Sequence, residues 1–252
     1  MNDDRHDDAA NGVPISRGSL RQQVTGRLLV GIFQGRLRSG QRLIVQQLAN
    51  LYRVSPTPVR ESLVELASLG LVDLAPNRGA VVRPFGPKEV REISQIRRVL
   101  EVEATRCATG RIEPAVIASL EHELTSLHDR APGPAWDRLV RDLDTRLHGL
   151  IARACGSDRL GAEIDRYLDL FRTLRDVSHH RDSGTNYSRS NDLPEHLEIV
   201  RALHAGDADE AARAMDRHIR SAARSLEDVV FGGPIPSRGG SVAPPGSFFA
   251  ED

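Results

Sequence analysis

The feature that most constrains the fold is a complete helix start signal at residues 55–58, which comes a few residues after the end of a short predicted helix. Ser55 can cap the helix, Pro56 takes the first helical position, where its missing N–H costs nothing, and Pro58 still falls within the first turn. The preceding short helix is predicted at about 45–52, because apolar residues recur there at helical spacing. Two short helices joined by so few residues are typical of a helix-turn-helix.

A longer helix precedes this pair, and a hairpin follows it. Apolar residues at i+4 spacing predict the longer helix over 20–35. Two short strands are predicted at 71–74 and 80–83, on either side of a turn at 75–79. This order of elements predicts a winged helix-turn-helix over residues 17–84.

The charge of this segment indicates a polyanionic partner. Residues 17–84 hold ten arginines and three acidic residues, a net charge of +7, although the whole chain carries only −1. Residues 85–231 hold 22 basic and 26 acidic residues, a net charge of −4. A compact basic segment beside a mildly acidic one predicts two domains, the first of which binds double-stranded DNA. The alternative is a small structural bundle whose arginines are merely solvated.

From Pro87 onward the pattern is helical. Six helices are expected, at about 87–109, 113–130, 135–154, 157–178, 192–205 and 207–230. We therefore predict a mainly α protein, with a small β-hairpin in the N-terminal winged helix-turn-helix and an all-α bundle over 85–231 for effector binding and dimerisation. The acidic residues 1–16 and the Gly-, Pro- and Ser-rich residues 232–252 are interpreted as disordered tails.

Several classes of protein are excluded by composition. No apolar run approaches the roughly 20 residues that span a bilayer, and the N-terminal residues lack the regions of a signal peptide. Cys107 and Cys155 form no CxxC group, which argues against a disulfide scaffold or a zinc ribbon. We expect a cytoplasmic protein that does not contact membranes.

Four polar side chains on apolar helix faces suggest a metal site. Asp144 and His148 lie one turn apart beside an apolar stripe that includes Leu139, while His196 and His218 share faces with apolar residues of two later helices. Burying such groups without a partner is costly, and a metal ion is one good partner for all of them. Three nitrogens and one oxygen suit a divalent transition metal such as Zn, Ni, Fe, Co or Mn. The alternative for each histidine alone is a satisfied core or surface position.

Other chemistry finds little support. The chain has no GxSxG, GxxxxGK[ST] or GxGxxG motif.

Four arginines are predicted on helices that would flank an effector cavity in the helical segment: Arg97, Arg98, Arg172 and Arg175. Of these, Arg97 and Arg175 are the candidates to hold an effector carboxylate. For each of them the alternative is a solvated face. Two other classes compete with a regulator: a non-haem iron type of enzyme acting on a small organic acid, and a purely structural helical protein.

Several motifs carry a family resemblance. Those of the basic segment are Leu37-Arg38-Ser39-Gly40-Gln41-Arg42-Leu43, Val54-Ser55-Pro56-Thr57-Pro58-Val59-Arg60-Glu61-Ser62-Leu63 and Asn77-Arg78-Gly79-Ala80-Val81-Val82. Those of the helical segment are Arg97-x-x-Leu100-Glu101, Asp144-x-x-x-His148, Glu195-His196 and Ala211-x-x-x-Met215-x-x-His218. Nearly all of residues 20–84 resemble the GntR-family winged helix-turn-helix, and the second part resembles the helical ligand-binding domain of the FadR subfamily.

The resemblance implies a homodimeric transcriptional regulator, a repressor rather than an enzyme, that binds a pseudo-palindromic operator. It also implies a small carboxylate effector, often held through a metal, with these ligands: Asp144, His148, His196 and His218. The implied DNA contacts are Arg60, Thr57, Ser55, Gln46, Arg78 and Gly79, with Arg60 expected to bind a guanine. Pro56 stands where the family usually has Arg or Lys, so we expect one contact to be absent.

Overall fold

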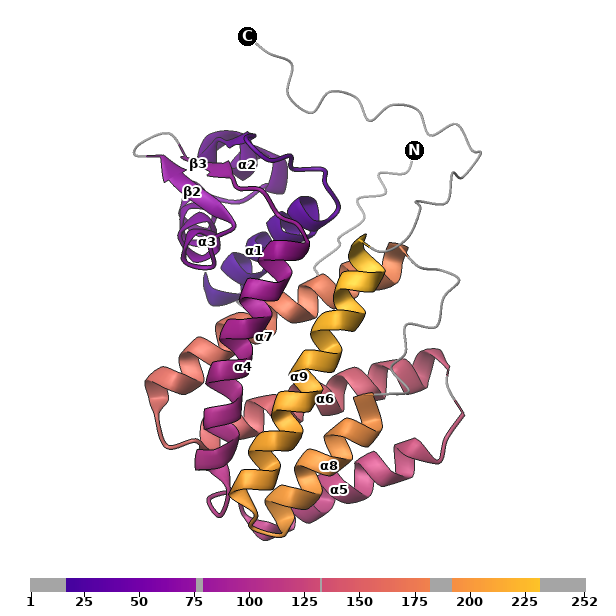
Figure 1. Cartoon of the computed structure of the whole chain (residues 1–252). Helices are drawn as coiled ribbons and strands as arrows, with labels where there is room; N and C mark the ends of the chain where they lie inside the picture. Colours follow the sequence, from indigo (N-terminus) through magenta and orange to yellow (C-terminus); the bar gives the residue numbers. More distant parts are fainter. Residues whose placement is uncertain (1–16, 76–78, 132, 182–191, 232–252) are drawn as a thin grey trace, which may run out of the picture.

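The computed structural model describes residues 17–75, 79–131, 133–181 and 192–231, and it places a small winged part above a larger helical part (Figure 1). The predicted tails lie outside these ranges. The winged part comprises α1 (Arg17–Phe33), β1 (Arg42–Leu43), α2 (Val45–Tyr52), α3 (Pro56–Ser68), β2 (Val72–Ala75) and β3 (Gly79–Val82). The predicted fold class, mainly helical with a winged helix-turn-helix, is confirmed.

The turn between α2 and α3 forms where the sequence predicts it, but Ser55 does not cap α3 with its side chain. Arg53 ends α2 in the left-handed conformation, with φ at 54°. Ser55 occupies the N-cap position with extended backbone, yet its hydroxyl makes no capping hydrogen bond. A capping side chain bonds to the N–H of the second or third helical residue, and the third is Pro58, which has none. The start of α3 therefore depends on the ring of Pro56 at the first helical position.

The wing is a three-stranded antiparallel sheet with the order β1-β3-β2, and not the two-stranded hairpin that the sequence predicts. β3 pairs with β2 along its whole length and with β1 at Leu43↔Ala80. β1 has only two residues, which is too short for an alternating pattern to reveal. Through this pairing, β1, which directly precedes α2 in the chain, is joined to the β2–β3 hairpin.

The helical part consists of α4 (Pro87–Ala108), α5 (Pro114–His128), α6 (Pro134–Ala154), α7 (Asp158–Arg181), α8 (Asp192–His204) and α9 (Ala208–Phe231). These are the six helices that the sequence predicts for the described residues. Each of α4, α5 and α6 begins with a proline, whose missing N–H is not needed at the first helical position. The assignment of Leu139 to the buried stripe of α6 is wrong, because Leu139 lies beside the stripe and is 43% exposed.

Two buried apolar clusters stabilise the molecule. The bundle cluster contains residues of α4 to α9. The second, which we call the winged cluster, is built on residues of α1, α2, α3 and the sheet, and it also includes residues of three helices of the other part. These are Val90 and Ile93 of α4, Leu170, Phe171 and Leu174 of α7, and Leu226 of α9. The winged part therefore completes its core with side chains from the helical part, and α7 passes directly beneath α1 (Figure 1).

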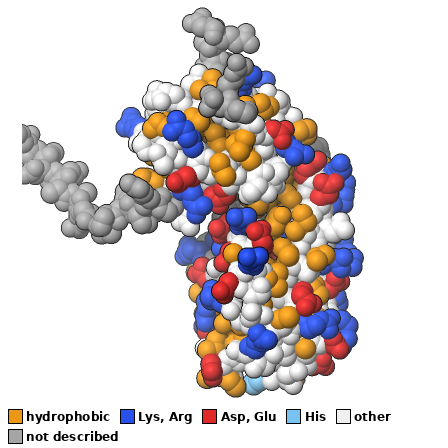
Figure 2. All heavy atoms as spheres, turned by 90° about the vertical axis from the view of Figure 1, so that its left-hand side faces the viewer, with side chains coloured by type: hydrophobic (Ala, Val, Ile, Leu, Met, Phe, Trp, Pro, Cys, Tyr) orange, Lys and Arg blue, Asp and Glu red, His pale blue; other side chains and the backbone are white. Residues whose placement is uncertain are grey.

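The helices, the surface and the two cysteines of the described residues can each be compared with the composition of the sequence. No helix within the described ranges is long and apolar enough to cross a membrane. Acidic and basic side chains are interspersed over the helical part on the face shown in Figure 2. Both cysteines are free; Cys155 is buried in the bundle cluster, and Cys107 packs against it.

Candidate metal centre and DNA-binding surface

Asp144, His148, His196 and His218 come together inside the helical bundle. α6 supplies the first two, one turn apart, while α8 and α9 supply one histidine each. All four residues are buried, with no more than 2% of any of them exposed. The structure thus brings together the four residues that the sequence singles out, and their role as metal ligands remains a prediction.

The donor atoms of these side chains point toward one another. Nε2 of His218 lies 3.3 Å from Nε2 of both His148 and His196. Oδ1 of Asp144 lies 3.6 Å from Nε2 of His148 and 3.4 Å from Nε2 of His196. Four donors around one ion at about 2.0–2.2 Å, the usual range for Zn²⁺, would lie about 3.3–3.6 Å apart in a tetrahedral arrangement. Four of the six donor–donor distances fall in this range, and all four donors lie within 4.8 Å of one another, a spacing at which they can surround a single ion.

Two glutamates hold two of the histidines in the tautomer that a metal requires. Nδ1–H of His148 donates to Glu101 of α4, and Nδ1–H of His218 donates to Glu195 of α8 at 3.0 Å. Nε2 of each ring then carries a lone pair, and the two lone pairs face each other, an arrangement that a cation between them would stabilise. Nδ1 of His196 is buried and has no hydrogen-bond partner among the described residues.

The protonation states of the cluster also suit a metal. Burial would raise the pKa of Asp144, but Arg175 and the neighbouring histidines hold the pKa of that carboxyl well below its usual range. Burial, together with His196 and His148, lowers the pKa of His218 well below its usual value. At neutral pH the cluster therefore presents an ionised carboxylate and a neutral imidazole, which are the forms that bind metals.

Glu101 and Glu195 occur in the family motifs, but no role at the cluster is predicted for either of them from the sequence. Glu195 directly precedes His196, and this adjacency is the only local signal for it. Glu101 is buried, and although burial would raise its pKa, Arg97 and His148 lower the pKa to about 2. Its position beside His148 follows from the packing of α4 against α6, which no local pattern predicts.

Arg97 is a candidate for effector binding that lies in an enclosed position. Only 3% of it is exposed. Its Nε donates to Glu101 at 2.6 Å, and its guanidinium lies over the ring of Phe171, with 4.3 Å between Cζ and the ring centroid. Both its charge and its planar face are engaged within the protein, which favours a structural role for Arg97.

Arg175 is the candidate that contacts the cluster itself. Its two terminal nitrogens donate to the two carboxylate oxygens of Asp144, at 3.1 Å and 2.5 Å. Arg98 and Arg172 lie nearer the surface, where they pair with Asp216 and Asp169 respectively. Of the four arginines, Arg175 is thus the one placed to meet a carboxylate at the cluster.

Most of the predicted DNA contacts lie on the surface of the winged part. Four of them are exposed on or directly before α2 and α3: Gln46, Ser55, Thr57 and Arg60. Gly79 begins β3 at φ +89°, and a Cβ atom on it would lie 1.9 Å from the carbonyl oxygen of Leu43. Arg78 lies outside the described residues.

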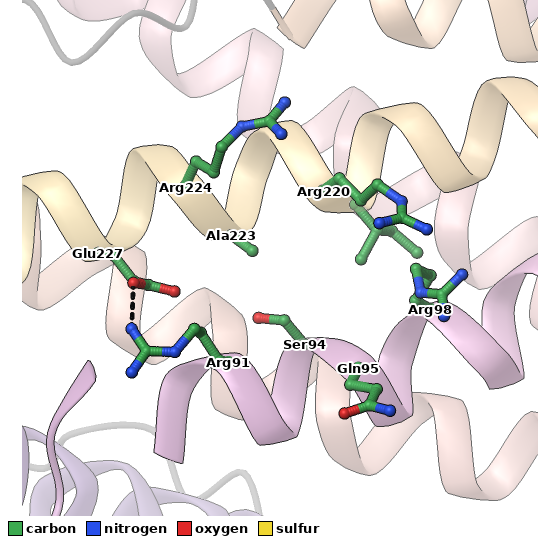
Figure 3. A pocket seen from close by; sticks show the side chains of 9 residues that line it. Arg91, Ser94, Gln95, Arg98, Arg220, Ala223, Arg224 and Glu227 are labelled. Carbon is green, nitrogen blue, oxygen red and sulfur yellow. Dashed lines mark hydrogen bonds and ion pairs between the residues drawn. The ribbon is translucent and has the colours of Figure 1, made fainter. Parts of the chain in front are cut away.

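A surface groove of about 330 Å³ runs between α4 and α9 (Figure 3). Three of the four arginines that line it pair with acidic residues: Arg91 pairs with Glu227 at 2.8 Å, and Arg98 and Arg220 both bind Asp216 at 2.7 Å. None of the four residues of the buried cluster lines this groove. The groove is therefore a feature separate from the candidate metal centre.

Comparisons with known proteins identify both parts of the chain. Residues 20–82 match the family described as bacterial regulatory proteins, gntR family, and residues 92–221 match the FCD domain. The HTH-type transcriptional regulator BphR of Paraburkholderia xenovorans is 30% identical and covers 84% of this chain and 87% of its own length. The HTH-type transcriptional repressor RspR of Escherichia coli K12 is 26% identical over 83% of this chain and 90% of its own length.

A solved structure shows the same fold. The structure of E. coli McbR/YncC has a TM-score of 0.60 and 23% identity, and it covers 82% of this chain and 97% of that one. The relatives are named as transcriptional regulators, which agrees with the expectation of a regulator and argues against the enzyme alternative.

Proposed function

Because the chain belongs to the GntR family of bacterial regulatory proteins and carries an FCD domain, it is a DNA-binding transcriptional regulator, and we propose that a metal and a small carboxylate control it. The observation that carries this proposal is the buried cluster of three Nε2 atoms and one carboxylate oxygen within 4.8 Å of one another. Such a group is costly to bury, and the lowered pKa values of Asp144 and His218 favour the forms that bind metals.

The residues that would hold the ion are Asp144, His148, His196 and His218. A bound divalent metal would supply positive charge at the centre of the bundle, where it attracts an anionic ligand. Arg175 lies beside this position, and its planar guanidinium can hold a carboxylate with two hydrogen bonds. Arg175 is therefore the residue to which we assign the effector carboxylate, and Arg97, whose guanidinium is engaged by Glu101 and Phe171, is not assigned this role.

Metal analysis of protein purified without a histidine tag tests this proposal. We expect a single divalent transition metal ion per chain, either as purified or after titration with Zn²⁺. Replacing His148 by Ala should abolish its binding, whereas His204→Ala should not, because His204 pairs with Glu121 on the exposed surface. A wild-type protein that neither contains nor takes up metal would disprove the metal part and leave the DNA-binding part intact.

For DNA binding, we propose a homodimer that places two copies of α3 in successive major grooves, about 34 Å apart. Arg60 would read a guanine with two hydrogen bonds, while Gln46, Ser55, Thr57 and the wing residues Arg78 and Gly79 would support binding around it. Selection of binding sites from random duplexes by the full-length protein should yield a pseudo-palindrome. A selected site without such a repeat would contradict the dimer arrangement.

The role of Arg60 can be measured on the selected duplex. Arg60→Ala should weaken binding by roughly 1–3 kcal/mol at constant salt. Arg60→Lys should retain the charge but lose discrimination at one base, since an ammonium lacks the planar fork. Arg166→Ala, which removes an exposed arginine of α7, should leave the affinity unchanged. If Arg60→Ala binds as tightly as wild type, another residue makes the main base contact.

A further inference from the structure

One turn of α7 lies between the candidate metal centre and the winged part. Leu170, Phe171 and Leu174 on this turn belong to the winged cluster, and each is 2% exposed or less. Arg175, the next residue, binds both carboxylate oxygens of Asp144. One short segment thus contacts a candidate metal ligand on one side and the core of the DNA-binding part on the other.

A second series of contacts reaches the same turn from a different ligand. Nδ1–H of His148 donates to Glu101, whose other oxygen accepts from Nε of Arg97 at 2.6 Å. The guanidinium of Arg97 then lies 4.3 Å from the centroid of the Phe171 ring. All the groups in this series are buried. Two of the four candidate ligands, both on α6, are therefore connected to residues 171–175 by independent routes.

We propose that Arg97 and Phe171 are positioning residues that transmit occupancy of the metal centre to the winged part through this turn of α7. The inference rests on the proposed function, because it concerns regulation by that same centre. Protein interiors are close-packed, so a shift of His148 or Asp144 on ligand binding must be accommodated by a contacting group. Both routes lead that shift to Phe171 and Leu174, which pack beneath α1. Metal binding thereby stabilises one packing of α1 on α7.

The test measures amide hydrogen exchange in the full-length protein with and without Zn²⁺. In wild type, Zn²⁺ should slow exchange in α1 and in the second half of α7 by about fivefold or more, the lower end of ordinary coupling between sites. Zinc affinity is measured in parallel by competition with a chelator. This readout requires neither the operator nor the natural effector.

Two variants remove the connection without removing a candidate ligand. Phe171→Leu keeps an apolar side chain in the winged cluster but removes the aromatic face under Arg97. Arg97→Lys keeps a cation beside Glu101 but lacks the planar group that covers the ring. Both should bind Zn²⁺ with nearly wild-type affinity and show clearly less protection of α1, since only the route through Arg175 remains. Phe33→Leu is the matched control, because it makes the same change in the same cluster at a ring that contacts Phe85.

The outcomes separate this inference from the function on which it rests. Zinc binding with full protection of α1 in wild type and Phe33→Leu, but with reduced protection in Phe171→Leu and Arg97→Lys, supports the inference. Undiminished protection in both variants overturns it, as does an equal loss in Phe33→Leu, which would indicate general loosening of the winged cluster. Zinc binding without any protection in wild type overturns the inference alone. Failure of wild type to bind zinc overturns the metal part of the proposed function together with the inference.

Discussion

At the scale of single residues, the candidate metal centre depends on side chains that do not themselves face the ion. Glu195 accepts a hydrogen bond from Nδ1–H of His218 at 3.0 Å and thereby fixes which ring nitrogen faces the cluster. Its replacement by Ala should lower zinc affinity by about 10–100-fold, the usual effect of removing a partner of a metal-bound histidine. Chelator competition with the purified protein measures this change.

The matched control for this prediction is Glu198→Ala. Glu198 lies on the same helix and is also a glutamate, but it pairs with Arg217 on the surface. Its removal should leave zinc affinity unchanged, since an exposed ion pair contributes little. Equal affinities for wild type and Glu195→Ala would show that His218 is oriented by the packing of α9 alone.

At the scale of elements, the sequence is informative wherever a helix carries its own signals. Pro56 marks the start of α3, and Pro87, Pro114 and Pro134 mark the starts of three further helices. Asp144 and His148 could be found because i and i+4 positions share one helix face. β1 and Glu101 could not be found in this way. Both acquire their roles from segments distant in the chain, since β1 pairs with β3 and Glu101 meets His148 of α6.

The three-stranded sheet of the wing depends on one glycine, Gly79 of β3. Gly79 combines φ +89° with a close approach to the Leu43 carbonyl oxygen of β1, so an added Cβ is excluded both by backbone conformation and by space. Gly79→Ala should lower the free energy of unfolding by about 1–3 kcal/mol or more. Urea unfolding followed by circular dichroism measures this loss. The expected weakening of DNA binding would then result from a distorted wing.

Gly26→Ala provides the comparison. Gly26 lies within α1 with nothing near the position of a Cβ atom, so alanine there should stabilise the helix by about 0.5–1 kcal/mol. A neutral effect of Gly79→Ala on stability would mean that the sheet tolerates the alanine by moving β1 away from β3. In that case any change in DNA affinity would report on the contact made by the wing tip itself.

At the scale of the whole molecule, the charge pattern and the packing give different views of the two parts. The division into a +7 segment and a −4 segment suggests two independent domains, one for DNA and one for the effector. The winged cluster, however, takes Leu170, Phe171 and Leu174 from α7, with further residues from α4 and α9. The two parts thus differ in their partners but share a core, and a shared core is what allows one part to respond to the other.

This shared core leads to a prediction about a fragment. Burial of a large apolar side chain contributes about 1.5–3 kcal/mol, so losing three residues of α7 should remove about 5 kcal/mol or more. That loss is comparable with the 5–15 kcal/mol by which a typical domain is stable. A fragment of residues 1–86 should therefore unfold at far lower urea concentration than the full chain, or be unfolded without urea, as followed by circular dichroism.

In the full chain, the winged and helical parts should unfold in one transition. Two separate transitions, the first coinciding with that of the fragment, would show that the winged part is stable by itself and that its contacts with α7 contribute little.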